Sequence, residues 1–392
     1  MAYRFTRDDV GYLDSATGRA ALAELDGLAL TSASLLKDLG QVRRAHGDRA
    51  AALIETVRLR RRARAKLAAA GEWLFTDDAL QQATPTAVAE HRAARLAGRA
   101  VHDVTCSIGA ELAALATHCP AVLGSDLDDV RLAMAARNLS RHRNVLLARA
   151  NALKSCSVGT VVIADPARRA DGRRTHDPAK LQPPLPDLLD TYRGRDLAVK
   201  CAPGLDFDRL GWPGEVEVVS LDGSVREACL WSPGLAEAGV TRRATVLSSK
   251  SAAWTITDAD PDVIDERAPG QWIIDPDGAV VRAGLVRHYA AKHGLWQLDP
   301  RIAYLTGDRI PAGTRGFRII DRLDYREKTL RAELRRRDCG PLEILARGVD
   351  VEPDRLRRNL KQAGSQPFTL VITRIGRTPT AFLCTAVDAR TR

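Results

Sequence analysis

One stretch of the sequence, residues 100–126, restricts the possible folds of this chain more than any other. It reads as an apolar strand over 101–105, a turn of small residues over 106–110, an alanine-rich helix, and a second strand that ends on Asp126. Strand, helix and strand in this order are typical of a parallel βαβ unit, in which ligands bind beyond the carboxyl ends of the strands. The stretch therefore predicts one βαβ unit with a crevice of nucleotide size.

The turn inside this stretch restricts the ligand as well. Small side chains let the backbone approach a ligand closely, and an acid at the end of the second strand can accept hydrogen bonds from both hydroxyls of a ribose. Of the dinucleotide pattern G-x-G-x-x-G only Gly109 is present, and Ser107 and Glu111 flank it. Because Glu111 would repel a pyrophosphate, the turn favours S-adenosylmethionine, which has a ribose but no phosphate. The alternatives are that the chain is another kind of α/β protein and that Asp126 is an ordinary helix-capping or solvated loop acid.

Further apolar runs follow, with room for helices between them. We expect a helix over residues 128–139 and strands over 144–149, 160–164, 197–201 and 215–221. Strands that alternate with helices form a doubly wound parallel sheet. Residues 227–231 and 243–247 lie too close together in the sequence for a crossover helix, so we expect them to form an antiparallel edge.

The two ends of the chain have different patterns. Apolar residues recur at helical spacing before residue 72, and residues 50–70 are an uninterrupted run of helix formers, which predicts one helix. Thr84 is a suitable N-cap, with Pro85 at the first position of the helix before the first strand. We therefore predict a helical N-terminal domain (1–72), an α/β domain (73–250) and a small α+β domain (255–392).

The charge of the chain points to a polyanionic partner. The chain has 59 lysines and arginines against 49 acids, a net charge of +10. Residues 37–66 alone carry ten lysines and arginines against three acids, and Arg60, Arg61 and Arg62 lie in the densest part. We expect these three arginines to contact the phosphates of RNA. A solvated helix surface is the alternative interpretation.

Several classes of protein are disfavoured by the sequence. The first residues, M-A-Y-R-F-T-R-D-D, form no apolar leader, and no run of 18 apolar residues follows, so we expect a cytoplasmic protein without membrane contact. Seven cysteines without a C-x-x-C pair and eight dispersed histidines predict neither disulfides nor a metal site. Cys106, Cys156 and Cys201 lie near the expected crevice but follow no proline, so we interpret them as small buried hydrophobic residues rather than nucleophiles.

Acceptor side chains stand at successive strand ends. Asp103, Asp126 and Asp165 follow three of the expected strands, and Asn151 follows another. This arrangement resembles the class I S-adenosylmethionine-dependent methyltransferases, whose cofactor turn corresponds to D-V-T-C-S-I-G. Together with A-T-P-T-A-V-A-E-H-R-A-A-R-L, it is similar to the trimethylguanosine synthase-like RNA methyltransferases over residues 75–247, and the downstream part resembles the THUMP-like domain of bacterial methyltransferases.

The resemblance implies a Rossmann-like methyltransferase sheet that binds S-adenosylmethionine. Asp126 would hold the ribose, and Asn151 would meet the adenine amino group. Ser107 and Ala110 stand where the family has glycines, and the aromatic residue after the Asp-Pro pair is absent. The residues implied to bind the cofactor are Asp103, Thr105, Cys106, Ser107, Gly109, Asp126, Leu127, Asn151, Ala152 and Asp165.

Asp165 and Pro166 stand where amino-group methyltransferases carry an Asp/Asn-Pro-Pro-aromatic motif. The resemblance implies that Asp165 accepts a hydrogen bond from a substrate amine and that Pro166 stiffens the loop. Arg168 and Arg169 would hold a phosphate or carboxylate of the substrate. The alternative for Asp165 is a strand-end acid that caps a turn. The alternative for Arg168 and Arg169 is that both side chains are only solvated.

Together these features predict transfer of a methyl group from S-adenosylmethionine to a base amine of RNA. A scaffold that binds RNA without turnover is a second hypothesis, favoured by the replaced glycines and the missing aromatic residue. A methyltransferase of a protein or a small molecule is a third, and it is favoured if the basic helix is plain surface.

Overall fold

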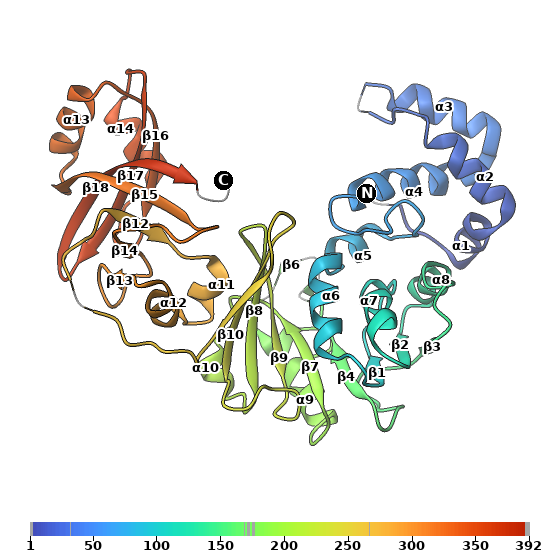
Figure 1. The fold of residues 1–392 in the computed structure, drawn as a ribbon. Coiled ribbons are helices and arrows are strands. Elements are labelled where there is room, and N and C mark those ends of the chain that lie inside the picture. Colours follow the sequence, from blue (N-terminus) through green and yellow to red (C-terminus); the bar gives the residue numbers. More distant parts are fainter. Residues whose placement is uncertain are drawn as a thin grey trace. The chain divides into compact units, whose positions relative to one another are not determined.

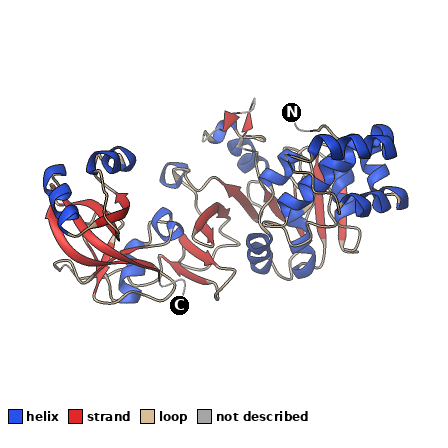
Figure 2. Ribbon diagram, turned by 90° about the horizontal axis from the view of Figure 1, so that it is seen from above, coloured by secondary structure: helices blue, strands red, loops and turns tan. Residues whose placement is uncertain are grey.

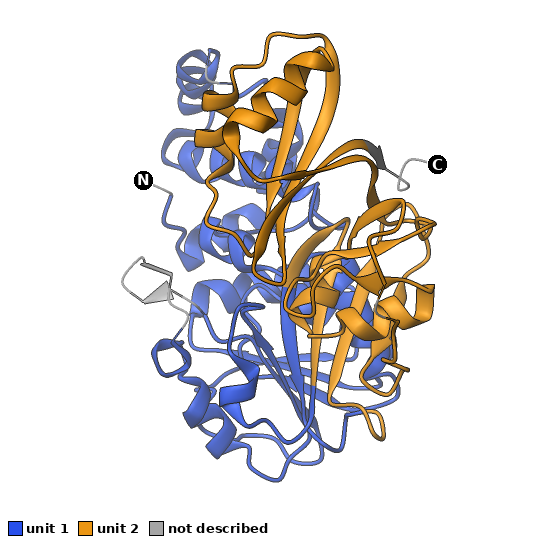
Figure 3. Cartoon of the chain, turned by 90° about the vertical axis from the view of Figure 1, so that its left-hand side faces the viewer, with its two compact units in different colours: residues 1–215, 227–236 blue, residues 216–226, 237–392 orange. Residues whose placement is uncertain are grey.

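The computed structural model describes residues 3–31, 33–167, 169–170, 173–174, 177–265 and 267–388. Its elements are labelled in Figure 1. The chain divides into two compact units, residues 1–215 with 227–236 and residues 216–226 with 237–392 (Figure 3). The domain boundaries predicted at residues 72 and 250–255 stay predictions.

The first unit begins with helices, as the apolar spacing predicted. Thr6 starts the first of them with a capping box, in which its hydroxyl accepts from the Asp9 amide and the Asp9 carboxylate accepts from the Thr6 amide. The apolar faces of these helices pack into one core around Leu53 and Val57. The helices are α1 (Arg7–Asp14), α2 (Ala16–Leu25), α3 (Leu35–His46), the short 3₁₀ turn η1 (Gly47–Arg49), α4 (Ala50–Ala63) and α5 (Asp77–Gln82).

The prediction of one helix over residues 50–70 is wrong beyond Ala63. The following segment bonds to a distant part of the chain instead of continuing the helix: the Lys66 carbonyl accepts from the Thr86 amide, and the Ala68 amide donates to the Thr86 hydroxyl. Helix propensity is a weak preference that such tertiary contacts override.

Helix α6 (Thr86–Arg95) leads into the sheet, and its predicted cap is also wrong. Pro85 occupies the N-cap position and no side chain caps the helix, whereas the Thr84 hydroxyl accepts a hydrogen bond from Lys200. The threonine therefore serves a long-range contact rather than the start of its own helix.

A nine-stranded sheet follows, in the order β11-β10-β8-β9-β7-β4-β1-β2-β3. The strands from β7 to β3 in this order are parallel to one another, as predicted, and helices flank the strands of the first unit (Figure 2). The sheet strands of this part are β1 (Val101–Asp103), β2 (Val122–Asp126), β3 (Val145–Arg149), β4 (Val161–Ala164) and β7 (Leu197–Cys201). The intervening elements are α7 (Ala110–His118), α8 (Asp129–Asn138), β5 (Arg169–Ala170), β6 (Arg173–Arg174), η2 (Pro178–Lys180), α9 (Leu185–Thr191) and α10 (Phe207–Leu210).

The remaining strands of this sheet correct one detail of the prediction. β9 (Ser224–Trp231) is antiparallel to β7, but β10 (Arg242–Leu247) is parallel to β8 (Glu215–Leu221). The antiparallel edge is formed by β11 (Trp254–Thr257) on β10. The short link between β9 and β10 is sufficient because the two strands run in opposite directions: β9 ends at the edge of the sheet where β10 begins, and β8 lies between them.

The last part of the second unit has a sheet of its own, in the order β13-β14-β12-β15-β18-β17-β16. Two helices with strongly one-sided apolar faces, α13 and α14, pack Leu330 and Leu356 into its core. Its elements are β12 (Trp272–Asp275), α11 (Gly278–Arg282), α12 (Val286–His293), β13 (Trp296–Gln297), β14 (Leu305–Gly307), β15 (Arg315–Asp324), α13 (Glu327–Arg336), β16 (Cys339–Ala346), α14 (Pro353–Leu360), β17 (Gln366–Ile375) and β18 (Thr378–Asp388).

A buried amide fixes the N-terminal helical part to the turn after β1. The Asn138 carboxamide accepts from the Leu74 amide at 2.8 Å and donates to the carbonyls of Leu74 and Ile108 at 3.1 and 3.0 Å. Ile108 belongs to the turn and packs into the same core as the N-terminal helices. The position of the turn therefore depends on helices far from it in the sequence.

Candidate functional site

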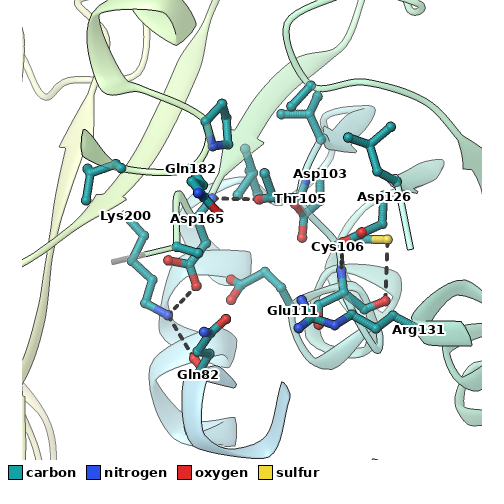
Figure 4. A pocket seen from close by; sticks show the side chains of 18 of the residues that line it. Gln82, Asp103, Thr105, Cys106, Glu111, Asp126, Arg131, Asp165, Gln182 and Lys200 are labelled. Atoms are coloured by element: carbon teal, nitrogen blue, oxygen red, sulfur yellow. Dashed lines mark hydrogen bonds and ion pairs between the residues drawn. The ribbon is translucent and has the colours of Figure 1, made fainter. Parts of the chain in front are cut away.

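A cavity of about 670 Å³ lies where β1, β2, β4 and β7 end, and Figure 4 shows the side chains that point into it. Its size is within the usual range for a small-molecule site. Of the residues predicted to bind a cofactor, the structure brings together Asp103, Thr105, Cys106, Ser107, Asp126, Leu127, Asn151, Ala152 and Asp165 at its wall. Gly109 and Pro166 are buried and are not among the residues that line the cavity.

The turn after β1 has a conformation that suits a close approach to a ligand. Ser107 and Gly109 have φ angles of +50° and +85°, in the left-handed region. A side chain at Gly109 would also meet Leu139, because a Cβ there would lie 2.6 Å from the leucine Cδ1. Ser107 thus takes the backbone conformation that a glycine usually supplies.

Asp126, at the end of β2, holds this turn in place. Its Oδ2 accepts from the Ser107 amide at 3.0 Å and its Oδ1 accepts from the Asp128 amide at 2.9 Å. Each carboxylate oxygen has a second lone pair, so Asp126 still has capacity for two donors such as the hydroxyls of a ribose. Leu127, the next residue, is 58% exposed and offers an apolar surface at the cavity wall.

Asp103, at the end of β1, is buried beside the cavity. Burial raises its pKa to about 7, and the charges of Glu111 and Asp165 act in the same direction against the hydrogen bonds from Thr105. The Asp103 Oδ1 accepts from the amide and the hydroxyl of Thr105 at 3.0 and 3.3 Å. The same hydroxyl accepts from the Asp165 amide at 2.7 Å, so Thr105 connects the ends of β1 and β4.

Two buried cations in this region were missed by the sequence analysis. Lys200 of β7 donates to the Asp165 carboxylate at 2.6 Å, and its side chain is only 9% exposed. Arg92 of α6 pairs with Glu111 at 2.5 Å and also with Glu227. Burial by itself lowers the pKa of Arg92, but the charge of Glu111 and of other neighbours outweighs it and holds this pKa above its usual value. A lone lysine in an otherwise apolar strand was the signal that could have revealed Lys200.

Three of the predicted substrate arginines, Arg60, Arg61 and Arg62, do not line this cavity. Arg60 donates to the carbonyls of Glu72 and Trp73, and Arg61 to those of Asp26, Leu28 and Ala29. Arg62 pairs with Asp77. Arg168 lies outside the described residues, and so does the side chain of Arg169. A role of these five arginines in substrate binding stays a prediction.

The three cysteines near the crevice differ in burial. Cys106 and Cys201 are buried, as expected, and burial raises the pKa of the Cys106 thiol well above its usual value. Cys156 is exposed, so its interpretation as a buried hydrophobic residue is wrong.

Within the described ranges, no three His, Cys, Asp or Glu side chains gather closely enough to bind a metal ion. No helix among the same residues is long and apolar enough to cross a membrane.

Two parts of the chain match known families. Residues 314–386 match the THUMP domain-like family, and residues 6–63 match a domain of unknown function. The second match falls on the N-terminal helices and carries no functional description.

Similarity also extends over most of the chain. Two curated relatives from Mycobacterium tuberculosis strains, each named an uncharacterized S-adenosylmethionine-dependent methyltransferase, are 56% identical over 340 residues, which cover 84% of this chain and 94% of each relative. The crystal structure of a putative methyltransferase from Porphyromonas gingivalis W83 covers 99% of this chain and 100% of its own at 17% identity, with a TM-score of 0.73. This second likeness concerns the fold.

The residues of the cavity fit S-adenosylmethionine, the methyl donor in the names of these relatives. Acceptors stand at the ends of three neighbouring strands, Asp103, Asp126 and Asn151.

We expect replacement of Asp126 by alanine to weaken cofactor binding by roughly 1–3 kcal/mol, because the ribose hydroxyls lose their acceptor. Calorimetry on Asp126→Ala tests this, with Asp129→Ala on the neighbouring helix as control. Equal affinities of Asp126→Ala and wild type would contradict the role of Asp126.

The affinity for S-adenosylmethionine should also depend on pH through Asp103. The folded pKa of about 7 lies above the ordinary value of 3.8, so the free protein holds a proton on Asp103 between these values. A cationic ligand group favours the ionised carboxylate, so affinity should rise with pH up to about 7 and binding should release a proton. Calorimetry in buffers of different ionisation heat measures this release. Asp103→Asn should abolish it, and an unchanged release in that variant would assign the proton to another group.

Proposed function

Because the chain belongs to the S-adenosylmethionine-dependent methyltransferases, we propose that it transfers the methyl group to a base amine of RNA. The observation that carries this proposal is the Asp165 carboxylate, which lies at the cavity wall next to the cofactor turn and has a side chain that is 40% exposed. An accessible carboxylate beside a bound methyl donor suits a neutral acceptor with an N–H to donate.

The chemistry requires alignment more than acid or base strength. S-adenosylmethionine supplies an electrophilic methyl group when it is bound. The amine nitrogen would form a bond to this carbon as the carbon–sulfur bond breaks, and the proton that the nitrogen then loses would pass to water. Asp165 would accept a hydrogen bond from the amine and point the nitrogen lone pair at the methyl carbon. The hydrogen bond from the Asp165 amide to the Thr105 hydroxyl fixes the loop that carries the carboxylate.

Features away from the cavity support RNA as the acceptor. The net charge of +10 favours a polyanion, and the match of residues 314–386 to the THUMP domain-like family is consistent with one. A base inside a duplex would first have to leave its stack, so we expect looped or single-stranded RNA to be the better substrate.

A hollow beside α2, α4 and α8 is the best candidate for phosphate contact in the first unit. Arginines outnumber acids at its wall: Arg19, Arg60, Arg64, Arg137 and Arg141 stand there with Asp26 and Glu72. The side chains of Arg64 and Arg141 are 60% and 81% exposed, whereas Arg60 is engaged with backbone carbonyls. Arg64 and Arg141 are therefore better positions than Arg60, Arg61 and Arg62 for testing RNA contact without disturbing the fold.

We expect the double variant Arg64→Glu with Arg141→Glu to bind RNA at least tenfold more weakly at low salt, with a flatter dependence on salt concentration, because phosphate contacts release counterions. Affinity for S-adenosylmethionine should not change. Filter binding over a salt series measures the effect, and Arg209→Glu, also an exposed arginine of the first unit, is the control. RNA binding that is absent from wild type or independent of salt would favour a protein or small molecule as the acceptor.

Replacement of Asp165 separates an enzyme from a scaffold. We expect Asp165→Ala to lose most methyl transfer while it keeps its affinity for cofactor and RNA, because the hydrogen bond acts in the aligned complex. Asp165→Asn should keep part of the activity, since the amide oxygen still accepts. The assay is transfer of labelled methyl to RNA from a strain that lacks this protein. Equal transfer by wild type and Asp165→Ala would refute the role, and no transfer by wild type to RNA, protein or small molecules would favour the scaffold.

A further inference from the structure

Lys200 is a charged side chain near the C-terminal end of a buried strand, and it has no part in the methyl transfer proposed so far. It lies in β7, whose residues are all buried, and its side chain reaches the cavity wall beside Asp165 (Figure 4). A lysine in such a place costs free energy unless its charge and its donors are satisfied. Its partners therefore indicate what the charge is for.

The Lys200 ammonium uses its full donor capacity within the protein. Its Nζ lies 2.6 Å from the Asp165 Oδ2, 3.1 Å from the Thr84 hydroxyl and 3.4 Å from the Gln82 carbonyl. An ammonium has three N–H groups and no lone pair. Three acceptors of this kind around one nitrogen are the environment of a fixed cation, so Lys200 is unsuited to take a proton from the substrate.

The pair leaves one oxygen of Asp165 available. Lys200 occupies Oδ2, and among the described residues no hydrogen bond reaches Oδ1. The backbone of Asp165 is held separately by the Thr105 hydroxyl. Asp165 is thus fixed at its carboxylate and at its backbone amide, so the remaining carboxylate oxygen has a defined place in the cavity.

We propose that Lys200 is a positioning residue for methyl transfer: it holds the Asp165 carboxylate so that the free oxygen meets the N–H of the acceptor. This proposal rests on the proposed function, because it assigns Lys200 a role through Asp165. It also limits the acceptor to a group that donates a hydrogen bond, since the donors of Lys200 are already taken and the free carboxylate oxygen only accepts.

A double-mutant cycle tests whether Lys200 acts through Asp165. Lys200→Met keeps the length of the side chain and removes the charge, and we expect kcat to fall about 10- to 100-fold, the scale of a small misplacement of reacting groups. The affinity for S-adenosylmethionine should stay within threefold of wild type. In Asp165→Ala the further change Lys200→Met should have no effect on kcat, because the group that it positions is gone. Lys250→Met, an exposed lysine elsewhere, is the control.

Chemical rescue separates positioning from a purely structural role. Lys200→Ala removes the atoms from Cγ to Nζ, and n-propylammonium has the same atoms. We therefore expect n-propylammonium to raise the kcat of Lys200→Ala at least tenfold. Tetramethylammonium has the charge but no N–H and should not restore activity. Thermal unfolding of each variant without the amine controls for folding, and rescue is compared only between folded samples.

The outcomes distinguish the positioning role from the identity of the acceptor. The assay uses RNA, protein and small-molecule fractions from a strain that lacks this protein, so the cycle can be run on whichever fraction wild type methylates. Methylation of protein alone would overturn the proposed function and still test Lys200. Independent losses in the two single variants, or failure of propylammonium to rescue a folded Lys200→Ala, would overturn the positioning role. No methylation of any fraction by wild type would overturn both.

Discussion

The buried ion pairs of Arg92 are the interaction on which the cavity most depends. One guanidinium of α6 holds Glu111 of α7 and Glu227 of β9, so a single side chain joins two helices and a strand of the same unit. Loss of one partner of a buried ion pair typically costs about 3–5 kcal/mol, because a charge is left without compensation. Asp165 adds further negative charge nearby, and Lys200 pairs with it. The wall of the cavity is thus a set of acids that two buried cations make compatible with folding.

Much of this architecture follows from local patterns. The run that ends at Asp165 is apolar throughout, as a central strand must be, and small residues mark the turn around Ser107 and Gly109. Because parallel strands end at one edge of the sheet, acids that follow separate strands in the sequence meet in space. This rule alone predicts that Asp103, Asp126 and Asp165 lie at one cavity, but it does not predict which atoms they contact.

The contacts that the sequence did not reveal are those made between distant segments. Thr84 stands before Pro85, where a helix cap is expected, but its hydroxyl accepts a hydrogen bond from Lys200, which is 116 residues away. Arg61 is typical of a surface cation in the sequence, but its guanidinium donates hydrogen bonds to three backbone carbonyls that follow α2. In each case a local rule and a tertiary contact compete for the same polar group, and a single sequence carries no record of the second. Asn138, which joins Leu74 to Ile108, is of the same kind.

Thr105 gives the cavity a directional property. Its one hydroxyl donates to the Asp103 carboxylate and accepts from the amide of Asp165. A hydroxyl that donates to a charged acceptor becomes a better acceptor itself, because hydrogen bonds in a chain polarise one another. Ionisation of Asp103 by an incoming methyl donor would therefore tighten the hold on the loop of Asp165. This coupling would be reciprocal: a firmly held Asp165 loop would in turn favour binding of the methyl donor.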